Sequence, residues 1–314
     1  MLSFSYVPAG PRAESRMKPS IIVHGGAGSG RYAKGDKRYG GLEEAVEAGL
    51  SAMKKGSGVD GVVAAVRSME DSGLFNCGRG ACLTAEGEAE LDAAVMSAER
   101  LAGAGVGNVT CTHNPVVLAR WVMENTEHVL IVGDRCRDYA ELAGLGAEEL
   151  TPSAQTLKRF RTLREGAPYR DNLRLVRRFK TGDTVGAAAV GADGIPAAAV
   201  STGGRWMKLP GRVGDSAIIG AGAFAGTGGA ASATGSGEDI IRVSLSMKAV
   251  EMVSRAGAAA GARKAIQLIT KVRGEGTAGI VAVDSKGRVG AAYNTESMGR
   301  AWWDVEKGRT VATF

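Results

Sequence analysis

The sequence predicts an α+β domain, in which strands pair as hairpins and helices occupy segments of their own. Two patterns carry this prediction, each made of two short apolar segments around a turn that contains Asp and Gly: Val185–Val190 with Ala197–Ser201, and Ala278–Val283 with Val289–Tyr293. Such a pattern is typical of a β-hairpin. The stretch between the hairpins, Glu238–Ile269, has a long helical pattern. We therefore expect a layered domain and not alternating βαβ units.

The N-terminal half begins with a predicted strand at Ser20–Val23, which runs into the glycine-rich stretch His24–Gly28. We interpret this stretch as a tight structural turn, because it has neither the GxxxxGK[ST] pattern nor the Gly-x-Gly-x-x-Gly spacing of a phosphate-binding loop. We interpret His24 as a buried, hydrogen-bonded histidine and not as a catalytic one.

Three helices and a further strand are predicted before the middle of the chain. The first helix has glutamates near its start and lysines at its end, which suits the helix dipole. Its apolar face is formed by Leu42, Ala45, Val46, Leu50 and Met53. Val59–Met69 is the second predicted helix, and Pro115–Asn125 is the third, with proline in its first turn. Val129–Val132 is predicted to be a buried strand.

Length and composition fit a globular protein of one large domain or two ordinary ones. The 314 residues are 44% hydrophobic, and no apolar run approaches the roughly 18–20 residues that span a membrane. The four cysteines are too sparse for a disulfide scaffold, and none of the three histidines has zinc-ligand spacing. We therefore expect a reducing, cytoplasmic location. Met1–Arg16 lack the apolar core of a secretory signal, and we expect a flexible extension or a misassigned start.

The net charge of +6 is concentrated in one segment. Between Leu150 and Asp183 there are nine basic and three acidic residues, so this segment accounts for the whole excess. The remainder of the chain is neutral, which argues against a basic nucleic-acid-binding body. The segment has weak periodicity and several breakers, and we interpret it as a basic linker between the two halves of the chain.

Four motifs carry the chemistry: Gly182–Gly186 (GDTVG), Ser201–Gly204 (STGG), Lys208–Ser216 (KLPGRVGDS) and Ala233–Glu238 (ATGSGE). In this order, and together with His24–Gly28, they resemble the plant-type asparaginase and isoaspartyl-peptidase family of N-terminal nucleophile hydrolases. The resemblance extends over nearly all of Lys18–Phe314.

The resemblance makes Thr184 the nucleophile. A threonine hydroxyl needs a nearby base, and no histidine lies beside a candidate nucleophile in the sequence. A threonine at a chain terminus has its own α-amine, which titrates near about pH 7.7–8.0. The family frees this amine by self-cleavage, here between Asp183 and Thr184, which would divide the single domain 17–314 into an α chain 17–183 and a β chain 184–314. Asp183 is a further candidate as a local base for the cut.

The resemblance assigns further roles by position. Thr202 supports the nucleophile, and Asn76 borders it. The hydroxyl of Thr234 and the backbone N–H of Gly235 form an oxyanion hole. The carbonyl of Gly237 receives the ammonium of the substrate.

Arg212 and Asp215 form a predicted clamp for a zwitterion. A guanidinium can bind a carboxylate in bidentate fashion, and a carboxylate can hold an ammonium, so the pair suits the α-carboxylate and α-amine of an aspartyl group. The resemblance assigns the same roles, and it implies no cofactor for catalysis. It also implies a loop that holds a structural Na⁺ through backbone carbonyls, at Met69, Glu70, Ser72, Phe75, Cys77 and Arg79. The loop departs from the usual family sequence at Gly73 and Cys77.

The implied fold is a four-layer αββα sandwich, assembled as an (αβ)2 pair of cleaved units. The implied activity is hydrolysis of L-asparagine and β-aspartyl dipeptides through a β-aspartyl-threonyl ester, with no nucleic-acid or membrane partner. Two alternatives remain within the superfamily, a glycosylasparaginase and a threonine aspartase. A third alternative, from another class, is a non-enzymatic module that binds an acidic partner through Leu150–Lys180.

Overall fold

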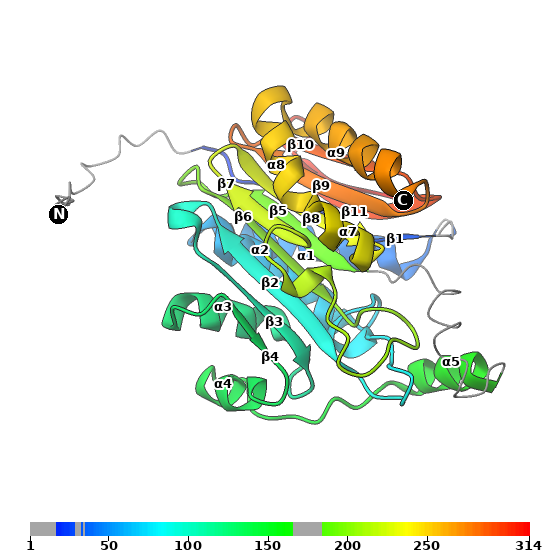
Figure 1. Cartoon of the computed structure of the whole chain (residues 1–314). Helices are drawn as coiled ribbons and strands as arrows, with labels where there is room; N and C mark the ends of the chain where they lie inside the picture. The colour runs from blue at the N-terminus through cyan, green and yellow to red at the C-terminus, as the bar shows by residue number, and fades with distance from the viewer. Residues whose placement is uncertain (1–16, 29–32, 34, 166–183) are drawn as a thin grey trace, which may run out of the picture.

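The protein is described by a computed structural model that covers residues 17–28, 33, 35–165 and 184–314 (Figure 1). The larger of its two sheets has eight strands within these residues. Their spatial order is β12 (Arg309–Thr313), β11 (Ser297–Asp304), β1 (Ser20–Gly28), β5 (Val185–Val190), β6 (Pro196–Thr202), β2 (Leu91–Ser97), β3 (Gly103–Val109) and β4 (Leu130–Val132). Neighbouring strands are antiparallel, except that β3 and β4 run parallel.

The smaller sheet has four antiparallel strands in the described part of the chain. Their order is β10 (Val289–Tyr293), β9 (Ala278–Asp284), β8 (Gly229–Gly235) and β7 (Ala223–Gly226). Both predicted hairpins are confirmed, because β5 pairs with β6 in the larger sheet and β9 pairs with β10 in the smaller one.

The two sheets pack face to face, and helices cover their other faces (Figure 1). Small apolar side chains fill the space between the sheets, among them Ala188 and Val200 from the larger sheet and Ala225 and Val283 from the smaller one. The outer face of the larger sheet packs against α1 (Lys37–Met53), α2 (Gly58–Ser72) and α3 (Pro115–Asn125). The outer face of the smaller sheet packs against α8 (Leu245–Ala256) and α9 (Ala258–Arg273).

Local sequence explains where the first helices begin and end. Ser57 and Asp60 form a capping box at the start of α2, in which each side chain accepts a hydrogen bond from the other residue's backbone N–H. The helix ends at Gly73, whose φ of 68° places it in the left-handed region. The three helices predicted in the N-terminal half are confirmed as α1, α2 and α3.

The long helical pattern at Glu238–Ile269 is not one helix. The structure divides it into α7 (Gly237–Val243), α8 and α9. The chain turns between α7 and α8 at Ser244, which has a φ of 49°, and between α8 and α9 at Gly257, which has a φ of 81°. The apolar spacing continues through both turns because all three helices face the same sheet, so periodicity alone does not reveal the breaks.

Two predictions for the N-terminal half are corrected. Strand β4 is exposed and not buried, because it is the edge strand of the larger sheet; the exposed fractions of Leu130 and Val132 are both 50%. The stretch His24–Gly28 is a continuation of β1 and not a turn. The pairing of β1 with β11 shifts register between His24 and Ala27, and Gly26 has a φ of 110°, so the strand is bulged there.

The basic segment Leu150–Asp183 contains a helix, α5 (Ala154–Glu165), which follows the short helix α4 (Cys136–Leu142). Phe160 anchors α5, because its buried ring packs with Leu83 and Met207. The rest of the predicted linker and the predicted extension Met1–Arg16 lie outside the described residues. Within the described residues, no helix is both long and apolar enough to cross a membrane.

Close packing against a short 3-10 helix, η4 (Asp215–Ala217), requires a glycine at position 105. A Cβ on Gly105 would collide with the backbone carbonyl of Ala217. We expect Gly105→Ala to destabilise the fold by about 1–3 kcal/mol, since the backbone has to shift. Gly107→Ala is the control, because its Cβ would meet only side-chain atoms of Val213 and Val132, which can rotate. Equal denaturation midpoints for the two variants would contradict this explanation.

Candidate active site

Thr184 lies at the start of β5, where the hairpin register brings it opposite Thr202. Val185 pairs with Ser201 across the β5–β6 hairpin, so the residues before Val185 and after Ser201 face each other. Both threonines are buried. The hydroxyl of Thr184 donates a hydrogen bond to the hydroxyl of Thr202 over 3.2 Å, and Thr202 Oγ1 also accepts from the backbone N–H of Gly204 over 2.9 Å.

Asn76 holds the chain that follows Thr202. Its side-chain Nδ2 donates to the carbonyl of Gly204 over 2.7 Å, and its Oδ1 accepts from the backbone N–H of Cys82 over 2.7 Å. Its own carbonyl accepts from the N–H of Gly203 over 2.9 Å. Since both ends of the amide are used within the chain, the structure places Asn76 as a support of the Thr202–Gly204 segment.

Arg212 is held by a carboxylate that the sequence did not single out. Its Nε and Nη2 lie 3.1 Å and 3.0 Å from Oε1 of Glu238, in the first turn of α7. The other oxygen of Glu238 lies 3.2 Å from Nη1 of Arg205. The remaining guanidinium nitrogen of Arg212, Nη1, faces the Cα atoms of Gly204 and Gly214. The only sequence feature that could have indicated the Arg212–Glu238 pair was the position of Glu238 at the end of the ATGSGE motif.

Asp215 is buried, and both Asp215 and Arg212 pack against Gly237, the first residue of α7. A Cβ on Gly237 would lie 2.6 Å from Nη2 of Arg212 and 2.7 Å from Oδ1 of Asp215. Burial raises the pKa of Asp215 to about 7, although the charge of Arg212 opposes the shift. Its Oδ2 has no hydrogen-bond partner among the described residues. A buried carboxyl oxygen without a partner suits the binding of a cation or a hydrogen-bond donor.

Thr234 and Gly235 are the last two residues of strand β8. The hydroxyl of Thr234 is completely buried, and no partner for it is found in the part of the chain that the structure describes. Gly235 has a φ of 133°, and the carbonyl of Thr277 lies so close to its Cα that a side chain would collide. The same carbonyl accepts a hydrogen bond from the N–H of Ser236 over 2.7 Å. The segment that contains Gly235 is therefore fixed by Thr277.

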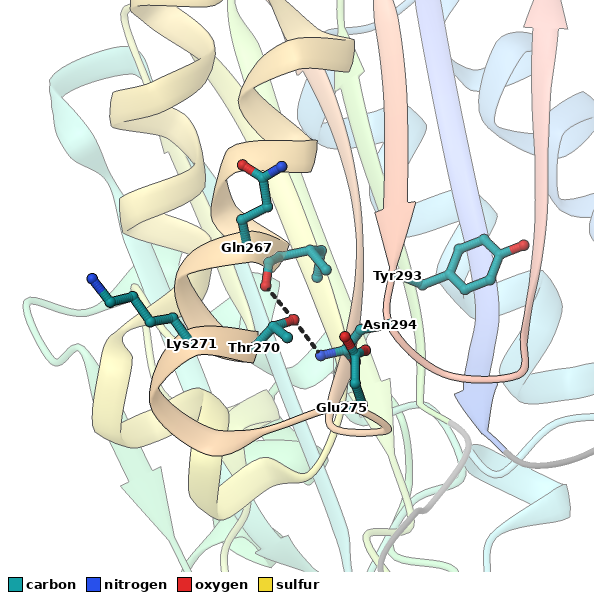
Figure 2. A pocket seen from close by; sticks show the side chains of 7 residues that line it. Gln267, Thr270, Lys271, Glu275, Tyr293 and Asn294 are labelled. Atoms are coloured by element: carbon teal, nitrogen blue, oxygen red, sulfur yellow. Dashed lines mark hydrogen bonds between the residues drawn. The ribbon is translucent and has the colours of Figure 1, made fainter.

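A second side chain that the sequence did not indicate, Asn294, fixes Thr277 in turn. Its Oδ1 accepts from the backbone N–H groups of Thr277 and Ala278 over 2.9 Å and 2.8 Å. Its Nδ2 donates to the hydroxyl of Thr270 in α9 over 2.7 Å. Figure 2 shows Asn294 and Thr270 in a surface hollow, which is lined by Ile266, Gln267, Thr270, Lys271, Glu275, Tyr293 and Asn294. None of the predicted site residues lines this hollow, and Asn294 reaches Gly235 only through the backbone of Thr277 and Ala278.

His24 is a buried, hydrogen-bonded histidine, as interpreted from the sequence. Its Nδ1 lies 3.0 Å from the carbonyl oxygen of Thr184, and its Nε2 lies 3.0 Å from the hydroxyl of Ser232. Complete burial lowers the pKa of His24 to about 3, although the hydrogen bond to Thr184 opposes the shift. The imidazole is therefore neutral at physiological pH.

The residues predicted for a Na⁺ loop lie at the end of α2 and in the following 3-10 helix η1 (Gly78–Gly80). Three of the carbonyls already accept hydrogen bonds: Met69 from the Ser72 hydroxyl, Phe75 from the Cys77 N–H, and Cys77 from the Gly80 N–H. The side chain of Glu70 is buried, and burial raises its pKa to about 8. Among the described residues, no group of three or more His, Cys, Asp or Glu side chains could hold a metal.

The predicted site residues thus fall into three groups: the hydroxyls of Thr184 and Thr202, the Arg212–Asp215 pair at Gly237, and the Thr234–Gly235 segment. Gly204 connects the first group to its neighbours: its N–H donates to Thr202, and its carbonyl accepts from Asn76. Arg212 packs closely against the same glycine. Asp183, the predicted residue on the other side of the cut, lies outside the described residues.

The raised pKa of Asp215 has a consequence for stability. The folded protein keeps a proton on Asp215 that the unfolded chain releases, so this residue lowers the stability progressively between about pH 4 and about pH 7, and fully above pH 7. Asp215→Asn should therefore raise the melting temperature at pH 8 and leave it unchanged near pH 4. Thermal denaturation across this range measures the difference. A variant that is less stable than the wild type at pH 8 would contradict the origin of the shift.

The chain is similar to known proteins over nearly its whole length. The asparaginase family matches residues 17–313. A plant-type L-asparaginase of Pyrobaculum calidifontis is 42% identical, over 90% of this chain and 96% of that protein. An isoaspartyl peptidase of Escherichia coli is 38% identical, over 94% and 99%. An isoaspartyl peptidase/L-asparaginase of Danio rerio is 35% identical, over 93% and 94%.

Proposed function

The chain belongs to the asparaginase family, and from this premise we propose that it is an amidohydrolase of L-asparagine and β-aspartyl dipeptides, with Thr184 as its nucleophile. The observation that carries the proposal is the buried hydrogen bond between the hydroxyls of Thr184 and Thr202 at the start of β5. The curated relatives support the substrate class, since their names give L-asparaginase and isoaspartyl-peptidase activity.

The proposed fold is the four-layer αββα sandwich of the N-terminal nucleophile hydrolases. Its support is the packing of the two sheets against each other, with α1, α2 and α3 on one outer face and α8 and α9 on the other. In this arrangement β5 is an interior strand between β1 and β6. A cut before β5 would therefore leave the two products interleaved, because β1 and β2 precede the cut and β5 and β6 follow it.

Self-cleavage is proposed as the step that creates the base. The Thr184 hydroxyl oxygen attacks the carbonyl carbon of Asp183, the peptide C–N bond breaks, and the Thr184 nitrogen takes up the proton. Water then hydrolyses the resulting ester, which frees the hydroxyl and leaves Asp183 as a new carboxyl terminus. The two products are the α chain 17–183, with any preceding residues, and the β chain 184–314.

The mature reaction repeats this chemistry on the substrate. The α-amine of Thr184 removes the proton from the hydroxyl as the oxygen attacks the β-carbonyl carbon. The Thr234 hydroxyl and the Gly235 N–H stabilise the negative charge that develops on the carbonyl oxygen, and each such donor is typically worth about 2.7–4 kcal/mol. Ammonia or an amino acid leaves with the proton, and water hydrolyses the β-aspartyl-threonyl ester.

The proposed clamp recognises the aspartyl part of the substrate. Arg212 binds the α-carboxylate while Glu238 fixes the orientation of its guanidinium group. Asp215 binds the α-ammonium with its free Oδ2, and the carbonyl of Gly237 assists. The clamp does not contact the leaving group of the substrate, which supports activity on both asparagine and isoaspartyl peptides.

A structural alkali ion is proposed for the loop Met69–Arg79. Its donors would be backbone carbonyls, and those that already accept one hydrogen bond keep a second lone pair. The carbonyls of Gly73 and Phe75 both crowd the Cα of Gly80, so carbonyl groups do gather in this loop. Pairing of two cleaved units into an (αβ)2 assembly is a further proposal, which rests on the family resemblance.

The nucleophile can be tested with a gel and a sequencing measurement. Purified protein should separate under denaturing conditions into a fragment of up to 183 residues and one of 131 residues, which is 314 less 183, and the smaller should begin at Thr184. Thr184→Ala should remain whole and release no ammonia from L-asparagine. Normal cleavage of Thr184→Ala, or a smaller fragment that begins elsewhere, would refute the proposed mechanism.

The clamp can be tested independently of self-cleavage. Arg212→Ala should still cut itself, but its kcat/KM for β-aspartyl dipeptides should fall at least about 30-fold, because losing one partner of a buried charge pair costs about 2–5 kcal/mol. Arg242→Ala is the matched control, since Arg242 is an exposed arginine of the neighbouring helix α7 that pairs with Asp239. An unchanged kcat/KM for Arg212→Ala would remove the clamp from the proposal.

A further inference from the structure

The carbonyl of Thr184 lies beyond the end of a β-ladder, two residues before Gly186, the last residue of β5 that pairs with β1. Strands β1 and β5 pair from Ser20 with Val190 to His24 with Gly186, and just beyond this point β1 is bulged against β11, at Gly26. No backbone group of β1 is paired with Thr184 across this ladder. The side chain of His24 occupies this place, since its Nδ1 lies 3.0 Å from the Thr184 carbonyl oxygen.

The direction of both hydrogen bonds of His24 follows from its partners. A carbonyl oxygen can only accept, so Nδ1 carries the hydrogen and donates it to Thr184. Because the imidazole is neutral, Nε2 has no hydrogen, and it accepts from the hydroxyl of Ser232 over 3.0 Å. Gly186 leaves room for this contact, because a Cβ there would collide with the hydroxyl of Ser232 and lie 2.5 Å from Nε2.

These two bonds join the two halves of the site. Thr184 belongs to the larger sheet, whereas Ser232 lies in β8 of the smaller sheet, two residues before Thr234. His24 therefore links the strand that carries the nucleophile to the strand that carries the proposed oxyanion donors. The three residues are distant in sequence, with separations of 160 and 208 residues from His24.

We propose that His24 is a positioning residue, which holds the Thr184 carbonyl so that the nucleophile keeps its orientation after it becomes a chain terminus. The inference rests on the proposed function. A free terminus tends to fray unless it is held, and cleavage removes the peptide bond on the amino side of Thr184. The hydroxyl–hydroxyl contact with Thr202 and the carbonyl contact with His24 are then the side-chain bonds that fix the residue.

Two near-isosteric substitutions separate the two hydrogen bonds of His24. The Nδ2 of asparagine can take the place of Nδ1, so His24→Asn keeps the donor to Thr184 and loses the bond to Ser232. The Nε2 of glutamine can take the place of the imidazole Nε2, so His24→Gln keeps a polar group near Ser232 and loses the donor to Thr184. Ser232→Ala removes only the hydrogen bond between Nε2 of His24 and the hydroxyl of Ser232.

Kinetics on the fully cleaved variants provide the readout. We expect His24→Gln to lose roughly 10- to 100-fold in kcat, because a misplacement of reacting groups by about 1 Å can cost about 100-fold in rate. Its KM should change little, since the clamp is separate from His24. His24→Asn should recover most of the lost kcat, and Ser232→Ala should lie between His24→Asn and His24→Gln. Where His24→Gln does not complete its cleavage, the rates of self-cleavage should follow the same order.

A purely structural role for His24 would give a different result. In that case both His24 variants would lose melting temperature and kcat together, without rescue by asparagine, and the inference would be overturned. A His24→Gln enzyme with the kcat and the self-cleavage rate of the wild type would overturn it as well. Measurements on the wild type test the proposed function separately. If the wild type neither cleaves itself nor turns over β-aspartyl substrates, the proposed function is wrong, and so is the inference.

Discussion

The position of β5 in the interior of the larger sheet is the constraint on which the site depends. The strand is paired with β1 on one side from Gly186 to Val190, and with β6 on the other from Val185 to Val190. Two ladders therefore hold the strand that follows Thr184, so Thr184 is presented at the end of a rigid element and not on a free loop. A cut before such a strand can release an amine without releasing the strand, because the backbone pairing on both sides is unaffected.

The two sheets contribute different halves of the candidate site. The larger sheet supplies Thr184 and Thr202, and the smaller sheet supplies Thr234 and Gly235. The small side chains between the sheets, mostly alanine and valine, allow close packing and so hold the two sets of groups at a fixed separation. Two side chains support these strands: buried His24 bonds to Ser232 of β8, and half-buried Asn294 bonds to the backbone of Thr277 and Ala278, beside the end of β8.

The sequence predicted the local features of the fold well. The hairpins at β5–β6 and β9–β10 and the helices α1, α2 and α3 follow from apolar periodicity and turn residues. It missed β2, β3, β7, β8, β11 and β12; the first four consist largely of small residues and have little pattern. It also merged α7, α8 and α9, which pack against the same sheet. Helix α5 was missed because a single aromatic side chain, Phe160, anchors it.

The sequence predicted the residues of the candidate site that lie in motifs. It did not predict the residues that contact the site only through the tertiary fold. Thr184 and Thr202 meet because of a local hairpin, which a sequence shows directly. The partners Glu238, Ser232 and Asn294 are joined to the site by hydrogen bonds between distant segments. No periodicity or spacing reports such contacts, since they depend on how the two sheets are stacked.

The charges of the clamp explain why a buried carboxyl group without a partner is retained. Glu238 pairs with both Arg212 and Arg205, whereas Asp215 has one oxygen without a partner among the described residues, and burial raises its pKa to about 7. An aspartyl group brings one positive and one negative charge, so the proposed substrate adds no net charge to the cluster. Its ammonium would stabilise the ionised form of Asp215 and offset the cost of burial. The free site is thus destabilised in the one place where the substrate carries the complementary charge, and binding relieves that destabilisation.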